Sequence, residues 1–365
     1  MGIVRVPRPA LVAGLGLVVA AGGAQAAGPQ AVTCGATLTA STTLADDLVA
    51  CPGTGLVIGA DGITVDLAGH TISGTNAPGG EGIASDGHSH VRIVGGRITG
   101  FRVNGVGIRG GRGNVVRGVT IRGIGAGGAE NEPVSAGIAI SHSPGGRVVG
   151  NDVSNDVKAF QSDGVDVLDS PGSTVVRNRL IRNNWNGLAL LGSARSRVAG
   201  NTLDRNGNNG VEVNGASDGA VVVANRARGD KRFGIVVGSA RHVRVVGNAA
   251  ARNDTGFLFF DLNDGLISAN RSRANGAEGI VLSGGQKGSA GNRVARNVAS
   301  GNGGAGIAVV EDNTGHASGN VLVGNVARRN GDHGIDAVDG QIDRGGNRAS
   351  GNRTPPQCVG VVCSR

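Results

Sequence analysis

The feature that most constrains the fold of this 365-residue chain is a repeat in which a glycine precedes an apolar residue. These glycine anchors recur at intervals of 22 to 32 residues. They are Gly82, Gly105, Gly137, Gly164, Gly187, Gly210, Gly234, Gly256, Gly279, Gly306 and Gly334. A period of this length is typical of solenoids, in which each repeat buries its apolar face only by stacking on its neighbours.

Two polar columns keep the same register as the anchors. The first column is Asn151, Asn178, Asn201, Asn225, Asn248, Asn270, Asn297, Asn325 and Asn347. The second follows five residues later and reads Asp156, Asn183, Asn206, Asp230, Asn253, Asn275, Asn302, Asn330 and Asn352. Asn tolerates left-handed backbone geometry, and its amide can hydrogen-bond to the next repeat. We therefore expect both columns at turns between strands.

Side chains after each anchor alternate with period two, as in the segments 187–190 and 210–213, which indicates short strands. No proline occurs between Pro171 and Pro355, as expected where most backbone N–H groups join parallel ladders. A coil of about 23 residues with three short strands would stack at roughly 4.8 Å per rung. The repeat thus predicts one continuous core rather than several globular domains.

On these residues the chain resembles the right-handed parallel β-helix proteins with pectin-lyase-like coils, and among them the NosD-like repeat group. The recurring phrase runs from Gly200-Asn201 through Asn206-Gly207 to the strand at 210–213. Cys34-Gly35 and the segment 60–72 are similar to the N-terminal cap and first coil of secreted bacterial members. The resemblance implies an all-β, right-handed parallel β-helix of about 11 or 12 coils. Its members include lyases, hydrolases, epimerases and adhesins, so it implies fold more than function.

The N-terminus has the pattern of a secretory signal. Arg5 and Arg8 precede an apolar run over residues 10–21, and Ala24-Gln25-Ala26 is a small-residue cleavage site. We expect a signal peptide over residues 1–26, a cap over 27–55, the β-helix over 56–352 and a tail over 353–365. No later segment is apolar enough to span a membrane. The mature protein is therefore expected to be secreted or periplasmic.

The four cysteines form two local pairs at opposite ends of the chain, Cys34 with Cys51 and Cys358 with Cys363. An even number of cysteines in an oxidising compartment favours disulfides. Four cysteines allow three connectivities, and we take the local pairing as the working hypothesis. Each bridge would then close one end of the solenoid.

Outward positions are the places for chemistry, because packing uses the inward ones. Two residues after successive anchors come Asp166, Ala189 and Glu212. The two acids are expected two rungs apart, roughly 9 to 10 Å by strand spacing. Carboxyl groups about 6.5 to 9.5 Å apart suit acid/base hydrolysis through a water. Asp166 and Glu212 are the predicted acid and base, with Asp163 as a partner or a metal ligand.

The residues around these acids could bind a sugar. Trp185 is the only Trp and offers a stacking surface, and amides and cations would contact hydroxyls and an acidic sugar. The predicted binding residues are Trp185, Asn186, Asn209, Lys231, Arg232 and His142. Insertions at 124–134 and between Asn151 and Gly164 are expected to wall a groove. The alternative is that this face is only solvated and that Trp185 covers a core edge.

Specific activities can be weighed by their motifs. The segment 162–166 is similar to the Asn-Thr-Asp-Gly-x-Asp motif of polygalacturonases, which implies catalytic roles for Asp163 and Asp166. The rest of that pattern is missing. A pectate-lyase-like mechanism would hold Ca²⁺ on Asp163, Asp166 and Glu212 with Arg232 as base, but no motif demands it. We therefore predict no cofactor, with Ca²⁺ as the one option left open.

Copper handling, which the NosD name suggests, would favour Met and clustered His. The chain beyond Met1 has no Met, and its one close His pair is His88 and His90. Arginines in the slot before the second Asn column, such as Arg182 and Arg205, could attract an acidic polysaccharide or simply aid solubility. Nucleic acid binding is not expected, because export and the scarcity of aromatics argue against it. The sequence thus predicts a protein that binds or processes a polysaccharide, or else a non-catalytic envelope protein.

Overall fold

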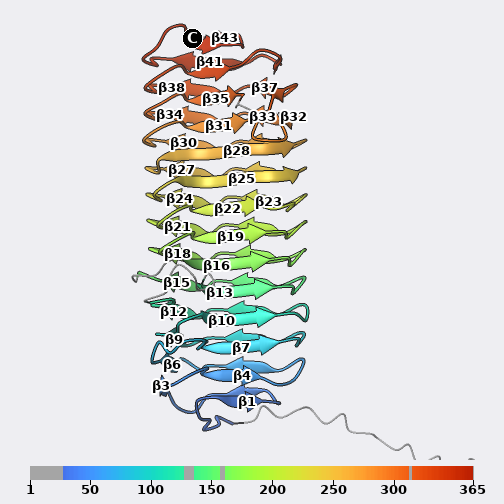
Figure 1. Cartoon of the computed structure of the whole chain (residues 1–365). Helices are drawn as coiled ribbons and strands as arrows, with labels where there is room; N and C mark the ends of the chain where they lie inside the picture. Colours follow the sequence, from blue (N-terminus) through green and yellow to red (C-terminus); the bar gives the residue numbers. More distant parts are fainter. Residues whose placement is uncertain (1–27, 127–134, 157–160, 312–314, 365) are drawn as a thin grey trace, which may run out of the picture.

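The computed structural model of the chain describes residues 28–126, 135–156, 161–311 and 315–364. In these ranges the chain contains strands and turns without a helix, and the strands form three long parallel sheets. Figure 1 shows the coils stacked as a column from β1 to β43. The predicted all-β, right-handed parallel β-helix is confirmed, with about 13 turns.

Sheet 1 contains the strands that begin at the glycine anchors. Its strands in spatial order are β1 (Ala36–Leu38), β4 (Leu56–Ile58), β7 (Ile83–Asp86), β10 (Asn104–Arg109), β13 (Ser135–Ser141), β16 (Ser162–Leu168), β19 (Leu188–Leu191), β22 (Val211–Asn214), β25 (Phe233–Arg241), β28 (Thr255–Asn263), β31 (Ile280–Ser283), β35 (Ile307–Val310), β39 (Ile335–Ala337) and β42 (Cys358–Val359).

Sheet 2 contains the second strand of each coil. Its strands are β2 (Thr42–Thr43), β5 (Thr64–Asp66), β8 (Arg92–Val94), β11 (Val115–Arg117), β14 (Arg147–Val149), β17 (Thr174–Val176), β20 (Arg197–Ala199), β23 (Val221–Val223), β26 (Arg244–Val246), β29 (Leu266–Ser268), β33 (Arg293–Ala295), β37 (Val321–Val323) and β40 (Ile342–Asp343).

Sheet 3 contains the third strand of each coil. Its strands are β3 (Leu48–Cys51), β6 (Thr71–Gly74), β9 (Arg97–Thr99), β12 (Thr120–Arg122), β15 (Asp152–Ser154), β18 (Arg179–Ile181), β21 (Thr202–Asp204), β24 (Arg226–Arg228), β27 (Ala249–Ala251), β30 (Arg271–Arg273), β34 (Val298–Ser300), β38 (Val326–Arg328), β41 (Asn347–Ser350) and β43 (Cys363–Ser364). A small pair, β32 (Ser289–Ala290) with β36 (Ala317–Ser318), lies outside the three sheets.

One apolar core runs the length of the solenoid. In β19, Leu188 and Leu190 point inward and are completely buried, and Val211 and Val213 repeat this arrangement one rung on. The period-two alternation therefore sets which residues lie outside as well as inside. Function on sheet 1 must use the outward residue between each buried pair.

Both amide columns form ladders at the turns. In the first, Asn178 donates from its backbone N–H and from Nδ2 to Oδ1 of Asn201, at 2.9 and 3.0 Å. The second ladder corrects the sequence register at one position. Asn155, which is buried, donates its N–H to Asn183 Oδ1 at 3.1 Å, whereas Asp156 is exposed. The offset is four residues on this rung, because it lacks the left-handed residue, such as Arg182 or Arg205, that precedes the ladder amide on the next rungs.

The glycine anchors and the second amide ladder depend on each other. A Cβ added to Gly187 would lie 2.8 Å from Asn206 Nδ2 and 2.8 Å from the carbonyl oxygen of Gly210. Any larger side chain would push the ladder amide away from the strand entry. The recurrence of glycine thus follows from the room that the amide needs, rather than from a positive φ.

Disulfides close both ends in the predicted pairing, Cys34 with Cys51 and Cys358 with Cys363. The end segments are also part of the solenoid. Residues 27–55 contribute β1, β2 and β3, and residues 353–365 contribute β42 and β43. These strands account for the turns beyond the 11 or 12 expected. The predicted signal peptide lies outside the described residues, as do residues 127–134 of the predicted wall segment at 124–134 and residues 157–160 of the one between Asn151 and Gly164.

Candidate functional site

Two acids lie two rungs apart on the outer face of sheet 1, in the predicted register. Asp166 in β16 pairs with Ala189 in β19, and Ala189 pairs with Glu212 in β22. Strand spacing then separates the two acidic residues by roughly 9 to 10 Å between Cα atoms. Ala189 offers only a methyl group between them, so the two side chains can lean toward a common space.

Asp166 is half-buried, and its Oδ1 atom is buried without a hydrogen-bond partner. Burial raises the pKa of Asp166 to about 6, and the negative charge of Glu212 adds to the rise. A carboxyl group in this state can hold a proton in weakly acidic solution and release it at neutral pH. These are the properties of a general acid.

Glu212 is held by amides. Its Oε2 atom accepts hydrogen bonds from Nδ2 of Asn186 at 3.2 Å and from Nδ2 of Asn209 at 3.4 Å. Asn186 is itself fixed, because its Oδ1 accepts the backbone N–H of Asn209 at 3.2 Å. The predicted amides therefore contact the predicted base and orient it.

Asp163 completes a cluster of three carboxyl groups. It is buried and accepts the backbone N–H of Asn186 at 2.8 Å. Burial and the nearby charge of Asp166 raise the pKa of Asp163 well above its usual value. Asp163 therefore supports Asn186, and burial together with the charge of Asp166 favours its protonated form.

Trp185 and Arg232 lie in the turns that lead into two strands of this face, β19 and β25. Trp185 is half-buried in the turn before β19, and its backbone N–H donates to the Ser162 carbonyl at 3.0 Å. Arg232 is exposed, with its guanidinium 5.0 Å from the ring centroid of Phe233. Phe233 begins β25 next to Asn209, to whose Oδ1 its backbone N–H donates at 3.4 Å, and the β25 residue opposite Glu212 is Val236.

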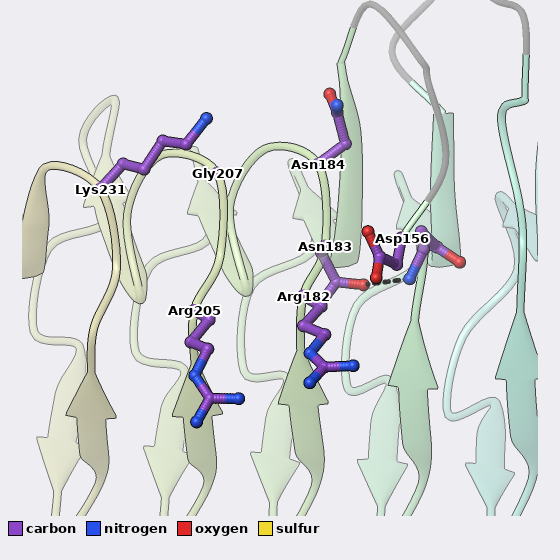
Figure 2. A pocket seen from close by; sticks show the side chains of 8 residues that line it. Asp156, Arg182, Asn183, Asn184, Arg205, Gly207 and Lys231 are labelled. Carbon is purple, nitrogen blue, oxygen red and sulfur yellow. Dashed lines mark hydrogen bonds between the residues drawn. The ribbon is translucent and has the colours of Figure 1, made fainter.

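Lys231 lies in a separate small pocket at the turns between sheets 3 and 1. This pocket has a volume of about 190 Å³ and brings together Asp156, Arg182, Arg205 and Lys231. Figure 2 shows Arg182 and Arg205 extending from successive rungs, with Lys231 on a turn above them. Two of the arginines that precede the second Asn column, Arg182 and Arg205, thus line one pocket with Lys231 and Asp156.

His142 is not brought to the carboxyl cluster. It follows β13 and its Nε2 lies 3.6 Å from Oδ2 of Asp169 at the exposed end of the neighbouring strand. The β13 residue that pairs with Asp166 is Ala139, three residues before His142. Three extended residues span roughly 10 Å, so strand direction separates the histidine from the acids.

Two features of sheet 1 were not predicted. A hollow of about 440 Å³ includes Leu258 and Phe260, and Phe260 lies over Gly238, where an added Cβ would meet the ring. Toward the N-terminal end, buried Glu81 pairs with Arg109 and accepts a hydrogen bond from Asn104. The sequence could have indicated the hollow, because Gly238 and Phe260 share one outward column. No sequence pattern indicated the buried ion pair.

The cluster can perform acid/base chemistry with its own residues. Asp166 can carry a proton, and Glu212 is oriented to accept one, which together suit transfer through a water or a sugar hydroxyl. Within the described residues, no three His, Cys, Asp or Glu side chains are placed to hold a metal ion. The same part of the chain has no helix of the length and apolarity needed to cross a membrane. The two disulfides fit an extracytoplasmic location.

Family models match most of the solenoid. One described as right handed beta helix region matches residues 54–227, and one described as periplasmic copper-binding protein (NosD) matches residues 215–352. The chain belongs to the right-handed parallel β-helix repeat family. No curated protein matches this β-helix significantly.

Solved structures show the same fold. The periplasmic alginate epimerase AlgG is 16% identical, with a TM-score of 0.64 over 79% of this chain and 76% of that one. The catalytic unit of a GH87 alpha-1,3-glucanase from Streptomyces thermodiastaticus is 16% identical, with a TM-score of 0.63 over 88% of this chain and 63% of that one. At these identities the likeness shows the fold of this β-helix and nothing finer.

Proposed function

We propose that this β-helix is an exported protein that binds or processes a polysaccharide on the outer face of sheet 1, across β16, β19 and β22. One observation carries the proposal: Asp166 and Glu212 share a column around a single Ala189, where burial raises the pKa of Asp166 to about 6 and two amides hold Glu212. Unlike environments for two nearby carboxyl groups are what acid/base catalysis requires.

In the proposed reaction Asp166 protonates the leaving oxygen of a glycosidic bond. Glu212, held by Asn186 and Asn209, takes a proton from a water that attacks the opposite face of the sugar. Trp185 stacks on a neighbouring ring. Arg232, in the turn before β25, and the cations of the separate pocket around Lys231 would favour an acidic sugar, because guanidinium and ammonium groups attract carboxylates.

The compared proteins support the class of ligand. Two β-helices of similar fold carry the titles of an alginate epimerase and an alpha-1,3-glucanase, both of which act on polysaccharides. A periplasmic or secreted location is supported by the N-terminal signal pattern and the two disulfides. A non-catalytic envelope role remains the alternative. Metal handling of the NosD type has less support, because the described residues do not gather three metal ligands.

The test is to incubate the mature protein with uronate and neutral polysaccharides, with and without Ca²⁺. New reducing ends or unsaturated products support an enzyme, and retention without products supports a binding protein. The variants Asp166→Asn and Glu212→Gln should remove the activity, whereas Asp169→Asn, an exposed acid at the far end of β16, should not. The site assignment is wrong if both site variants keep full activity. A polysaccharide that is neither changed nor retained would favour the envelope role.

A further inference from the structure

A ladder of arginines follows the outer face of sheet 2 at every second rung. The strand register places them in a single column, on β8, β14, β20, β26 and β33. The arginines are Arg92, Arg147, Arg197, Arg244 and Arg293. The strands between them contribute Val115, Thr174, Val221 and Leu266 to the same column. At about 4.8 Å per rung, the cations are spaced by roughly 9 to 10 Å over a length of about 38 Å.

The five arginines of this ladder are exposed and have no acid beside them. In the part of the chain that the structure describes, none of the five forms an ion pair, whereas Arg109, Arg122 and Arg179 elsewhere do. The strands of sheet 2 from β8 to β37 contain no Asp or Glu. The positive charge of this face is therefore available to a ligand.

A strip of small aliphatic side chains lies beside the ladder. The outward residues two places further along these strands are half-buried and apolar from β14 to β26, namely Val149, Val176, Ala199, Val223 and Val246, whereas exposed Arg117 on β11 and Ser268 on β29 interrupt the column on either side. These strands carry no aromatic residue. The face thus combines regularly spaced guanidinium groups with a flat apolar strip.

We propose that sheet 2 binds a linear anionic polysaccharide that lies along the solenoid axis and has one acid group per disaccharide. A disaccharide in an extended chain has about the length of two rungs, so each acid group would meet one guanidinium. Guanidinium groups bind carboxylates through two parallel hydrogen bonds, and the aliphatic strip would contact the apolar faces of the sugar rings.

Other polyanions fit this face less well. A single-stranded nucleic acid gains much of its affinity from stacking on aromatic side chains, which these strands lack. Exposed cations about 10 Å apart are largely screened from one another at physiological salt, so the arginines can stand in one column with little mutual repulsion. The rigid solenoid sets this spacing before the ligand binds.

The test measures binding of hyaluronan, which has one carboxylate per disaccharide, with neutral dextran as the control ligand. The ladder variant carries Arg147→Gln, Arg197→Gln and Arg244→Gln. The matched variant carries three exposed arginines of sheet 3 changed in the same way, Arg226→Gln, Arg271→Gln and Arg348→Gln. We expect the ladder variant to bind roughly tenfold more weakly, with a smaller salt dependence, and the matched variant to change less than about twofold.

A charge-conserving swap tests the spacing itself. Arg197→Thr with Thr174→Arg moves one cation by one rung at constant composition, and it should weaken hyaluronan binding as well. The proposal is wrong if the ladder variant and the matched variant lose the same hyaluronan affinity, or if the swap variant binds hyaluronan as the wild type does. Either result would mean that binding depends on net charge alone. The proposal is also wrong if a single-stranded oligonucleotide binds as tightly as hyaluronan and if the ladder and matched variants change its affinity in the same way. The Asp166→Asn, Glu212→Gln variant should retain the binding. If only this double variant loses hyaluronan binding, the polymer binds on sheet 1, which contradicts the sheet 2 proposal and agrees with the proposed function.

Discussion

Replacing Asp230 by Asn should stabilise the protein at alkaline pH. Asp230 occupies a position of the second amide ladder that Asn fills at most other rungs. Its Oδ1 accepts hydrogen bonds from the backbone N–H and from Nδ2 of Asn206, both at 2.8 Å, but its Oδ2 is buried without a partner. On the next rung Asn253 uses Nδ2 to donate to Asn275 Oδ1 at 3.2 Å. An amide at Asp230 would supply the donor that the carboxylate lacks.

The size of the effect follows from the pKa. Burial raises the pKa of Asp230 from 3.8 to about 7, although its bonds to Asn206 oppose the rise. Because the folded-state pKa is the higher one, the protonated form contributes stability that is complete below pH 3.8 and is lost as the pH rises through about 7. The loss at pH 8 is about 4 kcal/mol, at about 1.4 kcal/mol per pKa unit.

Urea unfolding of the wild type and Asp230→Asn at pH 5 and pH 8 measures this effect. We expect the wild type to lose about 3 kcal/mol more stability between the two values than the variant, which is the more stable protein at pH 8. Asp254→Asn, an exposed acid in a nearby turn, is the matched control and should behave as the wild type. Equal pH dependence in wild type and Asp230→Asn would refute the reasoning.

Three further predictions concern the site, the anchors and the ends. If the protein hydrolyses a glycan, kcat/KM should fall above about pH 6 as Asp166 loses its proton, and Asp166→Asn should lower it by roughly 10²- to 10⁴-fold at lower pH. Gly187→Ala should cost about 1 to 3 kcal/mol in urea unfolding, whereas Gly53→Ala, with nothing near its added Cβ, should cost little. The double variant Cys34→Ser, Cys51→Ser should raise hydrogen exchange in β1 to β3 and leave β22 protected, since each rung contacts only its neighbours. Faster exchange along the whole solenoid would contradict this local effect.

The sequence was sufficient for the solenoid because its period controls almost every contact. Once the anchors are aligned, Asp166 and Glu212 are placed in one column with Ala189 between them, and the structure has this register. The offset failed at Asp156, because this rung is one residue shorter between the two columns and puts Asn155 in the ladder.

Other features of the site depend on distances that a period does not contain. His142 shares the neighbouring strand with the residue opposite Asp166, yet strand direction carries it to Asp169. The period does not show that Asp163 is buried. The arginine ladder of sheet 2 was missed because its members are 47 to 55 residues apart, a spacing of two coils of variable length that only the register reveals.

The emission of Trp185 tests the central claim most directly. The chain has one Trp and no Tyr, so intrinsic fluorescence reports almost entirely on the turn beside the carboxyl cluster. Titration with an oligosaccharide that the protein retains should shift or quench this emission with a saturation curve that matches the Kd from calorimetry, and Glu212→Gln should weaken both. Binding detected by calorimetry with no change in the emission of Trp185 would place the ligand elsewhere and contradict the proposed site.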